Sequence, residues 1–273
     1  MEETSMNNHS VKFNNLLNHL KTYEQIAVAF SGGTDSTLLL KASQLALNDN
    51  VLAITVKTPY IPIWEIEEAI SFTKQHNIKH KILEFPFLIK LKENPKDRCY
   101  WCKSNLFKFM LKEAQKEKVN TLMDGTNLDD LNDYRPGIKA LKELKIISPF
   151  LDMSITKPEI RRFSLQLGLP TWEKPAYACL LTRIPYGQEI KNGELKRIEE
   201  TEKYLRSIGF DGSRVRIHGN LARIEIVKDN MPAILSPEMF NQISEKLRQA
   251  GFTYVTLDME GYRMGSHNDA MPE

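Results

Sequence analysis

Long hydrophobic runs are missing from this sequence. None of its 273 residues lies in a stretch that approaches the roughly 18 to 20 uninterrupted apolar residues of a membrane-spanning helix. The opening residues, MEETSMNNHSVKFNN, lack the basic-then-apolar order of a secretory signal. We therefore expect a globular, cytoplasmic protein that makes no use of a membrane.

Net charge is also small. The 37 basic and 35 acidic residues are interspersed and leave a formal net charge of +2. Proteins that bind nucleic acids through phosphates usually carry a strongly basic face. Composition therefore gives little reason to expect a nucleic-acid partner, although a local basic patch is still compatible with it.

Cysteine is scarce as well. The chain has three cysteines, an odd number. A cytoplasmic setting keeps thiols reduced, so a disulfide framework is a poor interpretation. Metal binding or sulfur chemistry explains the three residues better.

The first two-thirds of the chain alternates short apolar runs with helical patterns. We predict strands at about 25–30, 51–56, 80–85 and 121–123, and helices at about 36–47, 64–76 and 103–116. A Thr-x-x-Glu capping box, Thr156 with Glu159, opens a further helix. This order predicts an α/β, Rossmann-like fold with a parallel sheet covered by helices.

The pattern changes beyond Gln188. A long helix, two alternating strands, a helix and a final strand follow, at about 193–208, 214–218, 222–227, 237–250 and 254–257. Before them, residues 171–187 are irregular, which suits a hinge or an active-site segment. We predict a first domain over residues 1–187 and a smaller α+β domain over 188–273, used for substrate binding or oligomerisation.

A glycine-containing loop follows the first strand. In Ser31-Gly32-Gly33-Thr34-Asp35-Ser36 the glycines remove the Cβ atoms that would block an anion from the backbone amides and the helix N-terminus. The loop has neither the Lys of a P-loop nor the spacing of a dinucleotide fold. It predicts a phosphate site; the alternative is a tight turn capped by Ser and Asp.

This loop resembles the pyrophosphate loop (PP-loop) of the ATP pyrophosphatases, which cleave ATP between the α and β phosphates and transfer AMP to an oxygen. The resemblance implies an adenine nucleotide alpha-hydrolase-like fold. It also implies that Ser31, Gly32, Gly33, Asp35 and Ser36 hold the pyrophosphate, that Mg²⁺ bridges it, and that Asp35 is catalytic. Adenylylation turns a carboxylate oxygen into a good leaving group, and Mg²⁺ would neutralise the developing charge.

An acidic loop follows the fourth strand, and it should lie beside the phosphate loop at the carboxyl end of the sheet. Its carboxylates suit Mg²⁺, although a solvated Asx-rich turn has the same composition. The run DGTNLDDLNDYRPG, from Asp124 to Gly137, resembles the LarE family of ATP-dependent sulfur transferases. The resemblance implies Asp129 as a metal ligand, with Thr126 and Asn127 near the nucleotide.

The cysteines are placed for joint use. Cys99 and Cys102 form a Cys-x-x-Cys pair, Cys102 falls at the start of a predicted helix whose dipole favours a thiolate, and Cys179 lies in the irregular segment. Three thiolates can hold an iron–sulfur cluster and leave one iron open. A structural zinc site, which lacks an obvious fourth ligand here, and a buried pair without chemistry are the alternatives.

LarE proteins are of two kinds: one gives up the sulfur of a single cysteine, and the other holds a [4Fe-4S] cluster with three. The three positions here match the second kind. The resemblance implies that Cys99, Cys102 and Cys179 bind the cluster and that a sulfide from a donor, carried on the open iron, attacks the activated carboxyl. Cys179 is then catalytic, or sacrificial if no cluster forms.

Arginines gather after the third cysteine. Arg183 follows it closely, and Arg214, Arg216 and Arg223 lie on the two alternating strands, with Arg214 and Arg216 on one face. Guanidinium groups suit a phosphate or carboxylate; solvated strand charges are the alternative.

LarE-like enzymes act on pyridinium-3,5-biscarboxylic acid mononucleotide and make its thiocarboxylates for a nickel-pincer nucleotide cofactor. The resemblance implies that the four arginines and Glu202 contact this substrate, with Arg183 also catalytic. Trp101 would stack on its ring, although packing is the alternative role. The resemblance also implies a homo-oligomer.

We therefore predict an adenylylating sulfur transferase for a small-molecule mononucleotide. The alternatives within enzymes are a tRNA thiolation enzyme, which would need a basic face, and an amide-forming synthetase for NAD or GMP, which would not need three cysteines. A zinc-stabilised nucleotide-binding module is the non-enzyme alternative, and pyrophosphate release would separate it from the enzymes.

Overall fold

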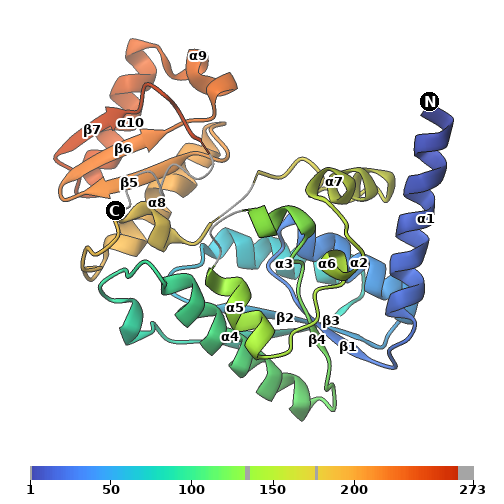
Figure 1. Ribbon diagram of the computed structural model, residues 1–273. Coiled ribbons are helices and arrows are strands. Elements are labelled where there is room, and N and C mark those ends of the chain that lie inside the picture. Colours follow the sequence, from blue (N-terminus) through green and yellow to red (C-terminus); the bar gives the residue numbers. More distant parts are fainter. Residues whose placement is uncertain (1, 133–135, 176–177, 264–273) are drawn as a thin grey trace. The chain divides into compact units, whose positions relative to one another are not determined.

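The computed structural model describes residues 2–132, 136–175 and 178–263. The chain forms two compact units (Figure 1). The first comprises Met1–Thr58, Ile63–Pro86 and Cys99–Ala176, and the second Pro59–Pro62, Phe87–Arg98 and Tyr177–Glu273. Two short segments that follow the second and third strands of the first unit thus belong to the second.

A four-stranded parallel sheet is the centre of the first unit. Its strands are β1 (Ile26–Ala29), β2 (Val51–Lys57), β3 (Lys79–Glu84) and β4 (Leu122–Met123), in the order β3-β2-β1-β4. Every neighbouring pair is parallel. This confirms the predicted α/β fold, which is consistent with that of the adenine nucleotide alpha-hydrolases.

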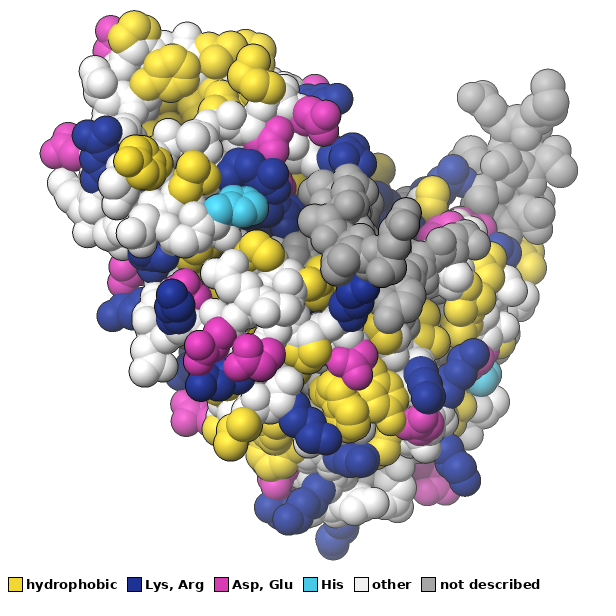
Figure 2. Space-filling view, turned by 60° about the vertical axis from the view of Figure 1, so that its left-hand side comes forward, with side chains coloured by type: hydrophobic (Ala, Val, Ile, Leu, Met, Phe, Trp, Pro, Cys, Tyr) yellow, Lys and Arg dark blue, Asp and Glu magenta, His cyan; other side chains and the backbone are white. Residues whose placement is uncertain are grey.

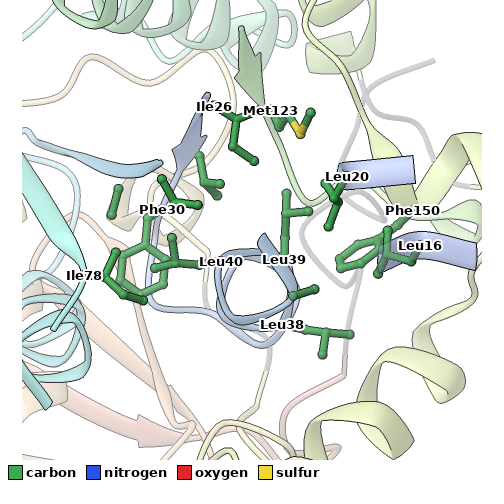
Figure 3. Packing of buried hydrophobic residues seen from close by; sticks show 14 of the residues in the cluster. Leu16, Leu20, Ile26, Phe30, Leu38, Leu39, Leu40, Ile78, Met123 and Phe150 are labelled. Atoms are coloured by element: carbon green, nitrogen blue, oxygen red, sulfur yellow. The ribbon is translucent and has the colours of Figure 1, made fainter. Parts of the chain in front are cut away.

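Helices cover both faces of this sheet (Figure 1). They are α1 (Glu2–Leu20), α2 (Thr34–Leu47), α3 (Ile63–Gln75), α4 (Arg98–Lys116), α5 (Pro136–Glu143), α6 (Pro149–Asp152) and α7 (Lys157–Gln166). Because successive side chains of a strand point to opposite faces, Ile26 and Val28 enter one core and Ala27 the other. Buried leucines of α1 and α2 fill the first core (Figure 3); Leu106, Phe107 and Met110 of α4 help to fill the second.

The second unit is built on a small mixed sheet. Strands β5 (Arg214–His218) and β6 (Leu221–Glu225) form an antiparallel hairpin, and β7 (Tyr254–Leu257) runs parallel to β6. The helices are α8 (Glu194–Ser207), α9 (Met231–Ile234) and α10 (Pro237–Gln249), with short 3-10 turns η3 (Leu180–Arg183) and η4 (Lys228–Asn230). The predicted smaller α+β part is therefore present. Its expected start at residue 188 stays a proposal.

Two surface features follow the composition. Basic and acidic side chains are interspersed over the face shown in Figure 2, and the two kinds are present in nearly equal numbers in the sequence. Among the described residues, every helix is too short or too polar to cross a bilayer.

Candidate functional site

The loop between β1 and α2 is shaped for an anion. Gly32 has φ +71°, a conformation that a residue with a Cβ seldom adopts. The backbone N–H of Ser31 donates to Ser36 Oγ at 3.2 Å, and Ser36 Oγ donates to Gly33 O at 3.2 Å, which closes the turn. The N-cap of α2 is Gly33, and no side-chain hydrogen bond caps it in the described part of the chain. Gly33 has no side chain that could cap α2, so the first amides of the helix are left for a ligand. The hydroxyls of Ser31 and Ser36 also bond within the turn, as the capped-turn alternative requires.

The acidic loop contacts this phosphate loop directly, as its position after the neighbouring strand β4 predicts. A Cβ atom added at Gly125 would lie 3.0 Å from Asp35 Cβ and 3.1 Å from Ser36 N. Only glycine allows so close an approach. Ser31, Gly32, Gly33, Asp35 and Ser36 thus come together with the loop that begins at Asp124.

Polar contacts fix the acidic loop. Ser148 Oγ donates to Asp124 Oδ1 at 2.6 Å, and Thr126 Oγ1 donates to Asp124 Oδ2. Asn127 Nδ2 lies 3.5 Å from Asp35 Oδ1, and the Asp129 amide donates to Asn127 Oδ1 at 3.0 Å. Thr126 and Asn127 are buried. Asn127 therefore contacts the phosphate loop, whereas Thr126 contacts Asp124 of the acidic loop. Their predicted place near the nucleotide stays a prediction, and Asp133 to Arg135 of the motif fall outside the described residues.

Lys157 is a site residue that the sequence did not point to. Its Nζ donates to both carboxylate oxygens of Asp35, at 2.7 and 2.6 Å, and its backbone N–H donates to Asp129 Oδ2 at 2.6 Å. Burial raises the pKa of Asp35, and the Lys157 ammonium acts in the opposite direction. The lysine lies within the Thr156–Glu159 capping box, as the first residue of α7, and the structure confirms this box. The capping box predicted where the helix begins. It did not predict that Lys157, the first residue of the helix, contacts Asp35.

The described part of the irregular segment also reaches the phosphate loop. Lys174 Nζ donates to Gly32 O at 2.8 Å and forms an ion pair with Glu68. Thr34 Oγ1 donates to Thr171 O at 2.9 Å. These contacts bring a second lysine to the loop.

The described residues offer some carboxylate ligands for a metal ion but no complete set of three. Among the described residues, no group of three or more His, Cys, Asp or Glu side chains is arranged to hold a metal. Asp35 and Asp129 do supply the carboxylate oxygens that Mg²⁺ prefers, beside a loop fit for phosphates. Since Mg²⁺ usually takes one or two carboxylates together with phosphates and water, these residues fit Mg²⁺ that arrives with ATP.

The cysteines are divided between the two units. Cys99 and Cys102 lie three positions apart on α4, close enough for one metal, and Cys179 precedes η3 in the second unit. None of the three is in a disulfide. Neither unit therefore contains all three cysteines. The helix begins at Arg98 rather than near Lys103, so the expectation for Cys102 was wrong: Cys99, not Cys102, lies in the first turn.

A buried ion pair supports the backbone at Cys179. Arg183 and Glu202 are 2% and 4% exposed, and two parallel bonds of 2.8 and 2.9 Å join them. Arg183 Nη1 also donates to the carbonyls of Ala178 and Cys179, at 2.7 and 3.2 Å. Arg183 and Glu202, both predicted as site residues, therefore contact each other, and Arg183 donates hydrogen bonds to groups of the protein.

The strand arginines are also held by protein groups. Arg216 pairs with Glu225, and Arg223 Nη2 donates to Glu225 Oε1 at 3.1 Å. Arg214 Nη1 donates to two backbone carbonyls, each at 2.9 Å, and its guanidinium lies 4.8 Å from the Tyr262 ring centre. Arg214 and Arg216 are buried, so neither is a solvated strand charge. Glu225, the carboxylate shared by Arg216 and Arg223, was not predicted from the sequence.

Trp101 is half-buried on α4. Its ring meets the Tyr100 ring edge to face, with centroids 5.1 Å apart. Tyr100 in turn donates to Glu143 Oε2 at 2.8 Å. Partial burial leaves part of the Trp101 side chain accessible to a ligand.

No protein-family model matches the chain. It is 39% identical over 259 residues to an uncharacterized protein of Synechocystis sp., covering 94% of this chain and 97% of that protein. It is 34% identical over 256 residues to the pyridinium-3,5-bisthiocarboxylic acid mononucleotide synthase of Lactiplantibacillus plantarum, covering 92% of each. A glutamine-hydrolyzing GMP synthase component of Thermoplasma acidophilum matches 165 residues at 27% identity, 54% of this chain and 53% of that one. The chain therefore belongs to the LarE-like PP-loop ATP pyrophosphatases and is an enzyme of that type.

Proposed function

We propose that this enzyme uses ATP to adenylylate the carboxylates of pyridinium-3,5-biscarboxylic acid mononucleotide and replaces the activated oxygen with sulfur. The substrate follows the name of the similar Lactiplantibacillus plantarum protein. The observation that carries the ATP chemistry is the uncapped start of α2, which Gly125 brings against the acidic loop.

The first step is transfer of AMP. A carboxylate oxygen attacks the α phosphorus, the bond to the bridging oxygen breaks, and pyrophosphate leaves with that electron pair. The amides after Gly33 hold the leaving pyrophosphate. Bound Mg²⁺, held through Asp35 and Asp129, would neutralise the charge on the phosphates.

Lys157 changes partner in this proposal. In the structure it neutralises Asp35. With Mg·ATP bound, Asp35 would hold the cation and the Lys157 ammonium would pair with a phosphate oxygen, so that neither charge would be left without a partner.

The second step is transfer of sulfur. A sulfide attacks the acyl carbon, the bond to the AMP oxygen breaks, and a thiocarboxylate and AMP result. A [4Fe-4S] cluster bound by Cys99, Cys102 and Cys179 would supply that sulfide from its open iron. The residues proposed to contact the substrate are Arg183, Arg214, Arg216, Arg223, Glu202 and Trp101. Arg183 acts on the reaction by fixing the carbonyls next to Cys179.

Two measurements test the proposal. Pyrophosphate release that requires the biscarboxylic mononucleotide, with the thiocarboxylate detected by its mass, would support it; release that requires tRNA or ammonia would favour the alternatives. Iron and sulfide that are lost together in Cys179→Ala support the cluster. A protein without iron whose Cys179 becomes dehydroalanine during turnover supports sacrificial sulfur instead.

The quaternary structure is a separate part of the proposal. A homo-oligomer is proposed from the LarE resemblance. Light scattering during size-exclusion chromatography gives the mass of the particle, to be compared with 31.5 kDa for one chain. A particle of one chain would refute it.

A further inference from the structure

Arg98 is a buried charge that the proposed chemistry does not use. It is the first residue of α4 and is only 2% exposed. Arginine stays protonated in folded proteins, so a full positive charge is buried here. Burying a charge is unfavourable unless a hydrogen-bonded group of opposite sign compensates for it.

The described part of the chain gives Arg98 no such group. Its Nε and Nη1 atoms are buried and have no hydrogen-bond acceptor there. The first turn of α4 contains no acidic residue, and Asp97, which precedes the helix, is exposed. By contrast, Arg183 and Arg216 of the same unit each hold a glutamate. Arg98 therefore has a charge and donors to offer.

The position of the guanidinium is fixed by its surroundings in the second unit. It lies 4.1 Å from the centre of the Tyr186 ring. Asn94, fully buried, donates from Nδ2 to three backbone carbonyls between Leu181 and Pro185, at 2.7 to 3.2 Å. These bonds fasten the segment that carries Tyr186 to the one that carries Arg98. Stacking of this kind uses the face of the guanidinium and not its N–H edge, where Nε and Nη1 have no acceptor among the described residues.

We propose that Arg98 binds an oxyanionic group of the second substrate, its phosphate or a ring carboxylate. Both groups supply the negative charge and the acceptors that Arg98 lacks, and a guanidinium fork matches either one. The segment fastened by Asn94 begins two residues after Cys179, so the anion is held by the part of the unit that carries the third cysteine. The identity of the substrate rests on the proposed function; the binding of an anion does not.

The test compares thermal unfolding of the full chain and of Arg98→Met, which keeps length and contact with Tyr186 but removes the charge. Each is measured without ATP, alone and with inorganic phosphate or pyridine-3,5-dicarboxylate. Without anion the variant should melt about 2 °C or more above the wild type, because an uncompensated charge is gone. The Tm increase caused by the anion should be smaller in the variant. The phosphate loop is intact in both, so the difference reports on Arg98.

The two anions distinguish the group that binds. A difference with phosphate alone assigns the phosphate of the substrate, and one with the dicarboxylate alone assigns a ring carboxylate. Equal Tm increases in wild type and variant with both anions would overturn the inference, as would a wild type that responds to neither. If the anion effect is found and pyrophosphate release is not, the anion site stands and the proposed function fails.

Arg197→Met is the matched control. The Arg197 guanidinium also lies over a ring, 4.2 Å from the Phe252 centroid, and its Nε is buried without an acceptor among the described residues. Its Nη1, however, donates to Gly251 O at 3.2 Å. This variant should keep the full anion effect. If Arg98→Met does not fold, Arg98→Lys replaces it; unchanged calorimetric affinity for both anions would then contradict the inference.

Discussion

Lys157 and Asp35, 122 positions apart in the sequence, form an ion pair in which Nζ lies 2.7 and 2.6 Å from the two carboxylate oxygens. The pair joins the start of α7 to the phosphate loop. In the proposed mechanism, bound Mg·ATP would separate Lys157 from Asp35. The effect of replacing Lys157 depends on this exchange.

Removing the Lys157 ammonium should slow turnover. In Lys157→Met a charge that stabilises the phosphates is lost, and we expect pyrophosphate release to fall about 100-fold. The control is Lys12→Met, which breaks the ion pair of Lys12 with Glu159 in the same unit and should change the rate less than about twofold. Equal effects of the two substitutions would show that Lys157 has no special part.

The close approach at Gly125 predicts a steric effect. The Cβ of Gly125→Ala would meet backbone and Cβ atoms at 3.0 to 3.1 Å, which should raise KM for ATP and destabilise the fold by about 1–3 kcal/mol. Gly137→Ala is the control, because its Cβ would meet the flexible Lys103 side chain. Urea unfolding and ATP kinetics check both; a silent Gly125→Ala would refute the close contact.

The Arg183–Glu202 pair should be strongly coupled. Arg183→Met leaves Glu202 buried without its partner, at a cost of about 3–5 kcal/mol in the free energy of unfolding. Adding Glu202→Leu should recover most of this loss. The exposed pair of Lys196 with Glu200 serves as control, with an expected coupling below about 0.5 kcal/mol. Additive losses at the buried pair would contradict the structure.

His80 should make stability depend on pH. Burial lowers its pKa from 6.5 to about 4; its Nε2 and Nδ1 lie 2.7 and 2.8 Å from the hydroxyls of Thr55 and Thr73. As the pH falls from about 6.5 toward 4, the unfolded chain takes up a proton that the folded chain refuses, so the folded state loses stability.

After allowance for partial exposure, this loss should reach about 1–2 kcal/mol. Urea unfolding of wild type and His80→Gln between pH 7 and 5 measures it. The variant should lack this part of the pH dependence. Parallel curves for the two proteins would show that His80 titrates normally.

Much of the fold could be predicted because its signals are local. The apolar runs of β1 and β2 and the glycines after β1 mark strands and a turn within a few residues. The start of α4 was placed too late, because Arg98 to Cys102 show no apolar periodicity. The segments 59–62 and 87–98 pack with residues far along the chain, which no local pattern encodes.

The candidate site also has a part that could be predicted from the sequence and a part that could not. The phosphate loop and the acidic loop could be found from their motifs and from their place after neighbouring strands. Lys157 and Glu225 could not, because each is defined by partners that only the folded chain brings near. Arg216 and Arg223 are register partners across the hairpin, yet the sequence alone gave no register.

The most direct test of adenylylation follows an oxygen atom. The biscarboxylic mononucleotide, labelled with ¹⁸O in its carboxylates, is incubated with the enzyme and Mg·ATP, and the AMP is analysed by mass spectrometry. The account predicts one ¹⁸O atom in AMP for each thiocarboxylate formed, because the carboxylate oxygen leaves on the phosphorus. Unlabelled AMP alongside thiocarboxylate would contradict it.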